Sequence, residues 1–248
     1  MSNNTWRIVG KIIKYISITF VFSVCAFMIW RVCSSGDPAS MKKISVSEPT
    51  YNAYVENGNE LGVYYQNLDY MSRDENALGY FGATKVDIIP SAEQIQLVLR
   101  YNNSTLRYVA EDLELDTVPG REENVFDVAL TVTTDLTPEN KDDNGGNPYE
   151  NPSQISEKKY YHSDFMLSDA KNVHNYRKYI FEGVSIDENT IAVFVDIYYK
   201  GDKSAPDYEN DSPICTLCIY WYGSDLQTRE LTKDDRQAFV DWKENQIG

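Results

Sequence analysis

Residues 15–33 read YISITFVFSVCAFMIWRVC and hold no charged side chain before Arg31. At 1.5 Å per residue, these 19 residues span about 28 Å as a helix, close to the hydrocarbon thickness of a bilayer. A core helix of a soluble protein would carry a polar stripe, whereas this stretch offers only scattered Ser17, Thr19 and Ser23. The stretch therefore predicts a transmembrane helix at residues 15–33.

The charges beside this helix predict its direction. Residues 1–14 form a short basic tail with Arg7, Lys11 and Lys14, and basic flanks remain in the cytoplasm. We therefore expect a single-pass protein of the cell membrane, with its N-terminus cytoplasmic and the bulk of the chain extracytoplasmic. A signal peptide has the same basic start and apolar middle, but this apolar stretch is longer than a usual h-region. Cleavage of the anchor is the alternative.

Charge and composition divide the rest of the chain. Residues 34–49 (SSGDPASMKKISVSEP) are small and polar, which is typical of a juxtamembrane stalk, and residues 50–248 form the expected extracytoplasmic domain. Residues 1–47 carry six basic and one acidic side chains, a net of +5, so the remaining 201 residues carry −20. Because phosphate backbones repel such a domain, we expect no nucleic-acid partner. Because the predicted helix lies in the bilayer, we expect membrane lipid to be a partner of this helix.

Turn residues separate apolar or alternating runs along the domain, which predicts a mainly β, antiparallel sandwich-like fold of the immunoglobulin-like kind. The expected strands are residues 83–89, 94–101, 105–113, 125–134, 178–186, 191–200 and 214–222, with 61–67 as an eighth. In 94–101 the alternation leaves Gln94, Gln96, Val98 and Arg100 on a largely wet face. A short polar link predicts a hairpin over residues 178–200.

Helical signals lie at the two ends of this domain. Residues 50–56 predict a helical turn, and Thr232 with Asp235 matches a helix N-cap with an acidic N3, opening a C-terminal amphipathic helix to about Asn245. Its apolar stripe is Ala238, Phe239 and Trp242. Residues 137–156 and 202–211 concentrate Asn, Asp, Gly and Pro, so we expect two exposed loops.

Two groups of residues invite a chemical interpretation. Cys215 and Cys218 form a Cys-x-x-Cys, but they lie in an apolar run typical of a buried strand, which favours packed thiols over a disulfide or a metal pair. His162 stands between Tyr161 and Ser163 in YYHSD, yet neighbours on a strand cannot face one another, so this is not a triad by itself. We expect a surface or packing histidine.

The segment from Asp142 to Asn147 (DDNGGN) resembles a run of calcium ligands but lacks the spacing and closing Glu of an EF-hand loop. We therefore favour a solvated loop for this segment, with weak calcium binding as the alternative. The sequence assigns no residue as a metal ligand. No phosphate loop or dinucleotide fingerprint is present in the sequence, so no cofactor is expected.

These observations predict a non-enzymatic, membrane-anchored binding or envelope-assembly module with a protein or glycan partner and no catalytic residues. One alternative is a cell-surface hydrolase that uses paired carboxylates on polysaccharide, because 38 acidic residues make such pairs inevitable. Another is that the helix itself is the functional part, pairing with other membrane helices.

Overall fold

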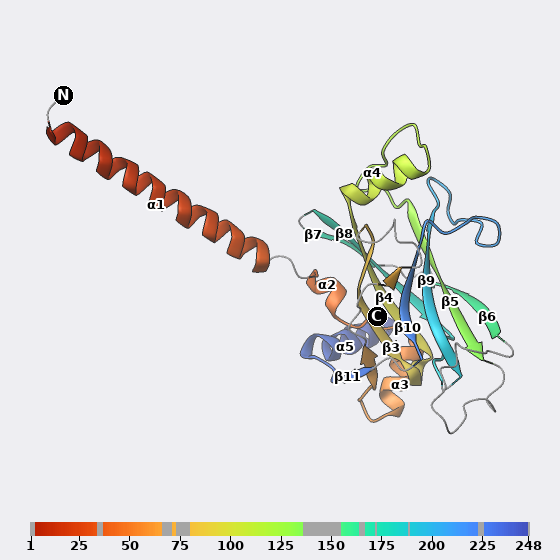
Figure 1. The fold of residues 1–248 in the computed structure, drawn as a ribbon. Coiled ribbons are helices and arrows are strands. Elements are labelled where there is room, and N and C mark those ends of the chain that lie inside the picture. The colour runs from red at the N-terminus through yellow and green to blue at the C-terminus, as the bar shows by residue number, and fades with distance from the viewer. Residues whose placement is uncertain are drawn as a thin grey trace, which may run out of the picture. The chain divides into compact units, whose positions relative to one another are not determined.

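The computed structural model describes residues 3–33, 37–65, 71–72, 80–135, 155–163, 167–171, 173–187, 189–222 and 226–247 (Figure 1). The chain divides into two compact units, Met1–Asp37 and Pro38–Gly248. The helices are α1 (Asn3–Cys33), α2 (Ala39–Lys42), α3 (Glu48–Glu56), the 3-10 turn η2 (Pro90–Ala92), α4 (Asn103–Asp112) and α5 (Lys233–Ile247). The strands are β1 (Val63–Tyr65), β2 (Met71–Ser72), β3 (Gly82–Ile89), β4 (Gln94–Asn102), β5 (Phe126–Asp135), β6 (Ile155–Tyr161), β7 (Leu167–Lys171), β8 (His174–Glu182), β9 (Thr190–Tyr199), β10 (Cys215–Trp221) and β11 (Gln227–Arg229).

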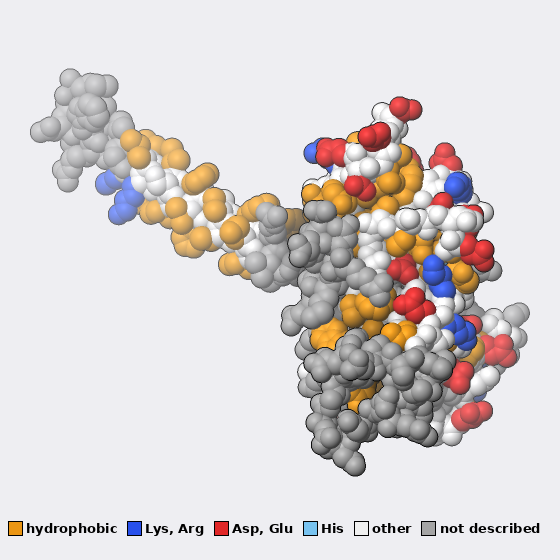
Figure 2. All heavy atoms as spheres, turned by 45° about the vertical axis from the view of Figure 1, so that its right-hand side comes forward, with side chains coloured by type: hydrophobic (Ala, Val, Ile, Leu, Met, Phe, Trp, Pro, Cys, Tyr) orange, Lys and Arg blue, Asp and Glu red, His pale blue; other side chains and the backbone are white. Residues whose placement is uncertain are grey.

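The first unit consists of α1. Its stretch Lys11–Trp30 is long and apolar enough to cross a membrane, and none of it is buried inside the protein. Apolar side chains of the helix such as Phe22 (72% exposed) and Ile29 (64%) are exposed, and the face of the helix seen in Figure 2 is largely apolar. The predicted N-terminal apolar helix is therefore confirmed, and by length and composition a signal sequence would fit the same stretch.

The second unit contains two antiparallel sheets, so the prediction of a mainly β fold is confirmed. Sheet A has the order β11-β1-β3-β4-β8-β7, and sheet B has the order β2-β10-β9-β5-β6. One apolar cluster takes side chains from both sheets, for example Leu97 of β4 and Leu130 of β5, each fully buried. The inner faces of the two sheets therefore share one core.

Along one edge the two sheets are joined through the chain that comes after β6. His162 forms an antiparallel bridge with Phe181 of β8, and the amide of Ser163 donates to the carbonyl oxygen of Ile180 at 2.8 Å. β6 itself pairs with β5 of sheet B, so one continuous segment passes from sheet B to the edge of sheet A. This crossing closes that side of the core.

The strand predicted at residues 105–113 is wrong, because this segment is helix α4. Leu106, Val109 and Ala110 are buried on one side at helical spacing. The side chain of Asn102 accepts the backbone N–H groups of Ser104 and Thr105, which completes a capping box. The cap and the 3.6-residue period decide in favour of a helix here, although Thr, Tyr and Val favour strands individually.

The hairpin predicted over residues 178–200 is also wrong. β8 pairs with β4 and β7 in sheet A, whereas β9 pairs with β5 and β10 in sheet B. Residues 183–189 therefore connect two sheets and do not form a turn within one. A short polar link has the same composition in both cases, so the sequence does not distinguish them.

The wet face predicted for β4 is wrong as well. Gln94, Gln96 and Val98 are at most 1% exposed, and only Arg100 stays partly exposed. Gln96 donates to the carbonyl oxygen of Ser45 at 2.7 Å and accepts the Ser45 amide at 2.9 Å. The polar alternation of β4 is thus used to bind another segment of the same chain.

That segment begins at Pro38, within the stretch predicted to be a stalk. Met41 and Ile44 are completely buried: Met41 packs with Val98 and Tyr176, and Ile44 joins a cluster under α3 and α5. Residues 38–49 are therefore part of the compact unit and cover the face of sheet A that points away from the core. We call this the outer face of sheet A.

α3 and α5 extend the same cover. The hydroxyl of Thr232 accepts the Asp235 amide at 3.1 Å, and the Asp235 carboxylate accepts the Thr232 amide at 2.9 Å, as the N-cap pattern predicts. The ring of Phe239 stacks on that of Tyr54 with centroids 4.0 Å apart. In Figure 1 α4 lies at one end of the sheets and α3 and α5 at the other.

Candidate functional site

A cavity of about 220 Å³ opens at the end of sheet A, where β3, β4 and β8 meet. Its lining residues are Tyr80, Phe81, Gly82, Arg100, Tyr101, Asn102 and His174. Gly82 is the cross-strand partner of Arg100, and Asn102 is the partner of His174. Cross-strand partners share a face, and Gly82 has no side chain, so space remains beside Arg100.

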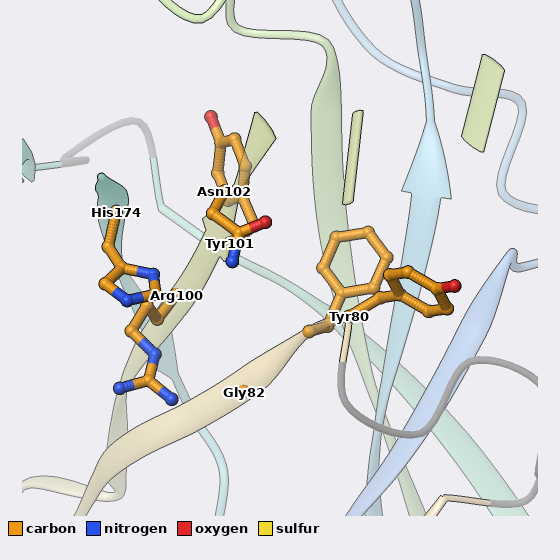
Figure 3. Close-up of a pocket in the computed structure, with 7 residues that line it drawn as sticks. Tyr80, Gly82, Arg100, Tyr101, Asn102 and His174 are labelled. Atoms are coloured by element: carbon orange, nitrogen blue, oxygen red, sulfur yellow. The ribbon is translucent and has the colours of Figure 1, made fainter. Parts of the chain in front are cut away.

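The side chains of Arg100 and His174 lie on one side of this cavity and that of Tyr80 lies beyond Gly82, as Figure 3 shows. The ring of Tyr80 stacks on Tyr108 of α4 with centroids 4.1 Å apart. The cavity thus has a basic side and an aromatic side.

The guanidinium of Arg100 forms no hydrogen bond or ion pair with any residue that the structure describes. Other arginines of the same unit behave differently: Arg229 binds the carboxylates of Asp87 and Asp235, and Arg236 binds Glu60. Arg100 is half-buried and lines the cavity without a hydrogen-bond partner among the described residues. A guanidinium has five N–H donors, which a ligand in the cavity can use.

His174 has a positive electrostatic environment. Burial lowers the pKa of His174, and the charges of Arg100 and Arg121 lower it further. Its Nδ1 atom is buried and forms no hydrogen bond with any described residue. Arg121 is held behind it, since Nε of Arg121 donates to Oδ1 of Asn175 at 3.0 Å. Nδ1 is thus enclosed by the protein, and the rest of the imidazole ring borders the cavity.

His162, the histidine singled out in the sequence, is bound at both ring nitrogens. Nε2 lies 2.6 Å from Oδ1 of Asp127, and Nδ1 lies 2.7 Å from the carbonyl oxygen of Ser163. A carbonyl and a carboxylate both accept, so each ring nitrogen lies against an acceptor oxygen and not against a hydroxyl or thiol in these two contacts. Its ring also packs edge-on against Tyr179 at 5.2 Å. This geometry is that of a packing histidine.

The two cysteines of the Cys-x-x-Cys differ in burial. Cys215 is 2% exposed and belongs to the shared core, whereas Cys218 is partly exposed and its thiol donates to the carbonyl oxygen of Tyr220 at 3.3 Å. Among the described residues no group of three or more His, Cys, Asp or Glu is placed to hold a metal. The run from Asp142 to Asn147 lies outside the described residues, as does Asp164.

Buried carboxylates gather on the outer face of sheet A, around Arg229. Asp87 and Asp235 are at most 1% exposed, and both bind this guanidinium. Burial raises the pKa of Asp235, but hydrogen bonds from Arg229, Ile44 and Thr232 outweigh burial and hold the pKa at about 2. A general acid of a glycosidase needs a raised pKa, so this carboxylate is unsuited to that role.

The cavity residues were not candidates from the sequence. Arg100 is predicted only as part of a wet strand face, and His174 falls in no recognisable motif. They meet because β4 and β8, over 70 residues apart in sequence, pair in one register. The one sequence feature that could have pointed to the cavity is an arginine in a strongly acidic domain, and this feature has little specificity.

Comparisons with protein-family models, with curated proteins and with solved structures gave no match. The functional argument therefore rests on the chemistry and geometry of these residues.

Proposed function

We propose that this chain is a single-pass membrane protein whose extracytoplasmic β-domain is a non-enzymatic binding module, with the cavity at Arg100 as its binding site. The observation that carries the proposal is the apolar stretch Lys11–Trp30, of which no part is buried by the protein. Covering a large apolar side chain stabilises it by about 1.5–3 kcal/mol relative to water. A bilayer supplies this cover along the whole stretch, and the basic residues before it support a cytoplasmic N-terminus.

Protease treatment of cells that express the full chain with a C-terminal tag tests the anchoring. We expect protease added to intact cells to remove the tag and leave a small membrane-embedded fragment with the N-terminus. A cytoplasmic protein treated in the same cells serves as the control for intact membranes. Recovery of the full-length chain from the soluble fraction contradicts the proposal, and so does release of a mature form without α1.

The binding role is supported by the cavity, which is concave, partly apolar, and contains a few convergent polar groups, as ligand sites generally do. A protein or glycan of the cell envelope is the proposed partner. Mild crosslinking on intact cells should give an adduct that is lost with Arg100→Gln and retained with Arg107→Gln, an exposed arginine outside the cavity. Equal adduct formation by both variants contradicts a role for this cavity.

Several finer predictions belong to the same proposal. An immunoglobulin-like arrangement of the sheets, an amphipathic role for the C-terminal helix and membership of an envelope assembly stay predictions. The hydrolase alternative gains no support from the described carboxylates, since Asp235 has a lowered pKa.

A further inference from the structure

The unused donors of the cavity at Arg100 indicate what kind of ligand it accepts. A guanidinium presents a planar fork of N–H groups that matches a carboxylate or a phosphate through two parallel hydrogen bonds. No described carboxylate takes up this fork, although 37 acidic side chains lie after residue 47. The fork is therefore available to a carboxylate or phosphate from outside the chain.

The surroundings of Arg100 add positive charge. His174 shares the cavity lining, and Arg121 lies behind it, with Nη2 donating to the carbonyl oxygen of His174 at 3.4 Å. Arg121 thus adds a positive charge close to Arg100, although residues 111–123 at the same end of the domain also hold six acidic side chains.

The size and the walls of the cavity restrict the ligand further. A volume of about 220 Å³ is below the roughly 300–1,000 Å³ of pockets for drug-sized ligands, so the group that enters the cavity is small, whether it is a whole molecule or part of a larger partner. The ring of Tyr80 lies away from Arg100, and Phe81 adds a second ring to the lining. An apolar group attached to the anion would lie against these rings.

We infer that the cavity binds a small oxyanion carrying an apolar group, held by the guanidinium of Arg100 and the imidazole of His174 against Tyr80 and Phe81. This inference rests on the proposed role of the cavity as the binding site. It does not depend on the anchoring of α1. A free metabolite and the phosphate headgroup of a lipid share this chemistry, and the experiment separates them.

The test uses the full chain in nanodiscs of phosphatidylcholine, titrated with phenyl phosphate, benzoate and inorganic phosphate and followed by calorimetry. We expect phenyl phosphate or benzoate to bind, and phenyl phosphate to bind more tightly than inorganic phosphate. Arg100→Gln should weaken binding about tenfold or more, as for loss of a charged hydrogen-bond donor, and His174→Gln should weaken it less. Arg107→Gln is the matched control and should change the dissociation constant by less than about twofold.

The source of the anion is identified with a second set of nanodiscs that contain phosphatidic acid. If a lipid headgroup fills the cavity, phenyl phosphate binds more weakly in these discs, and Arg100→Gln abolishes the difference between the two discs. If the ligand is a free metabolite, phenyl phosphate has the same dissociation constant in both kinds of nanodisc. Both outcomes support an oxyanion site.

Two results overturn the inference. One is that neither phenyl phosphate nor benzoate binds to a wild-type chain whose thermal unfolding shows it to be folded. The other is that Arg100→Gln, equally folded, binds as well as the wild type. Protease mapping on cells tests the anchoring independently, so failure of the ligand inference and failure of the membrane proposal are distinguishable.

Discussion

The outer faces of the two sheets carry similar polar side chains, but the described chain covers them to different extents: residues 38–56 lie over sheet A, whereas on sheet B the described cover is local, with Tyr208 packed against Tyr198. On sheet A, Gln94, Gln96 and Lys178 are at most 1% exposed beneath residues 38–56. On sheet B the face away from the core is buried at Ala129 and Tyr198 but stays partly exposed at Thr131 and Phe194. The comparison teaches that polar alternation in a strand does not by itself predict a wet face.

The physical difference lies in the groups that these polar side chains bind. On sheet A they bind main-chain atoms of a distant segment: Lys178 donates to the carbonyl oxygen of Lys43 at 2.6 Å, and Gln96 binds both main-chain groups of Ser45. On sheet B, Asp196 accepts the hydroxyls of Thr131 and Thr216 on neighbouring strands. Changes on sheet A should therefore cost more, because they leave buried main-chain groups without partners.

The largest effect is expected for Asp235→Ala. Asp235 is fully buried, accepts the Ile44 amide at 2.6 Å and binds Nη1 of Arg229 at 2.7 Å. Its loss removes one of the two carboxylates that bind Arg229 and leaves the buried Ile44 amide without its partner, so the free energy of unfolding should fall by about 3–5 kcal/mol. Denaturant unfolding in detergent micelles measures this. Asp196→Ala is the control on sheet B, and an equal loss for both variants contradicts the comparison.

Lys178→Met should change how stability depends on pH. Burial, and to a smaller extent the charge of Lys85, lower the pKa of Lys178 to about 7. Between this value and the ordinary 10.5 the unfolded chain binds a proton that the folded chain has released, so stability rises with pH. From pH 7 to 9 the wild type should gain about 2 kcal/mol that the variant does not.

Lys159→Met is the matched control for this pH dependence. Lys159 lies on sheet B and donates to the Tyr198 hydroxyl and to the carbonyl oxygen of Tyr208, each at 2.9 Å. Burial lowers the pKa of Lys159, but the hydrogen bond to Tyr198 outweighs burial and the pKa is raised overall. This variant should keep the wild-type slope between pH 7 and 9. Parallel profiles for wild type and Lys178→Met would refute the role assigned to Lys178.

Gln96→Leu should have a smaller effect, a loss of about 1–3 kcal/mol, because the amide and carbonyl of Ser45 lose their partner inside the protein. Hydrogen exchange locates the change: the Ser45 amide should exchange faster, while amides of β9 in sheet B keep their rates. Unchanged protection of Ser45 would mean that the cover of sheet A does not depend on this side chain.

The smallest effect is expected for Thr131→Val on the outer face of sheet B. The Thr131 hydroxyl donates to Asp196 at 2.6 Å, but the residue is partly exposed, so water replaces the donor. We expect a loss below about 1 kcal/mol by the same unfolding measurement. A loss as large as that of Gln96→Leu would show that the two outer faces do not differ in energetic importance.

Much of the β framework is predictable from the sequence. The alternating runs at residues 83–89, 94–101, 125–134, 191–200 and 214–222 coincide with strands β3, β4, β5, β9 and β10. Their β-branched and aromatic residues fit a pleated, buried surface, and turn residues separate them. Strands β6 and β7 were missed because their polar sequences do not show a buried face.

The candidate site is not predictable in the same way. Arg100 and His174 lie 74 positions apart, and each belongs to a strand whose sequence is explained by packing alone. They come together only through the register of β4 with β8, and Gly82 of β3 leaves space on the other side of Arg100. Pairing register depends on contacts along whole strands, so no local motif records it.

The sequence by itself determined the uncharged apolar helix, the acidic character of the domain after it and the β-rich composition of that domain. These properties are local, since hydrophobic length, charge and residue period can be read without knowing any partner. Tertiary structure alone decided that residues 38–49 cover sheet A, that β8 and β9 lie in different sheets and that Arg100 faces a cavity. Those features depend on which distant segments meet, because the same polar side chain is wet or buried according to the segment that lies over it.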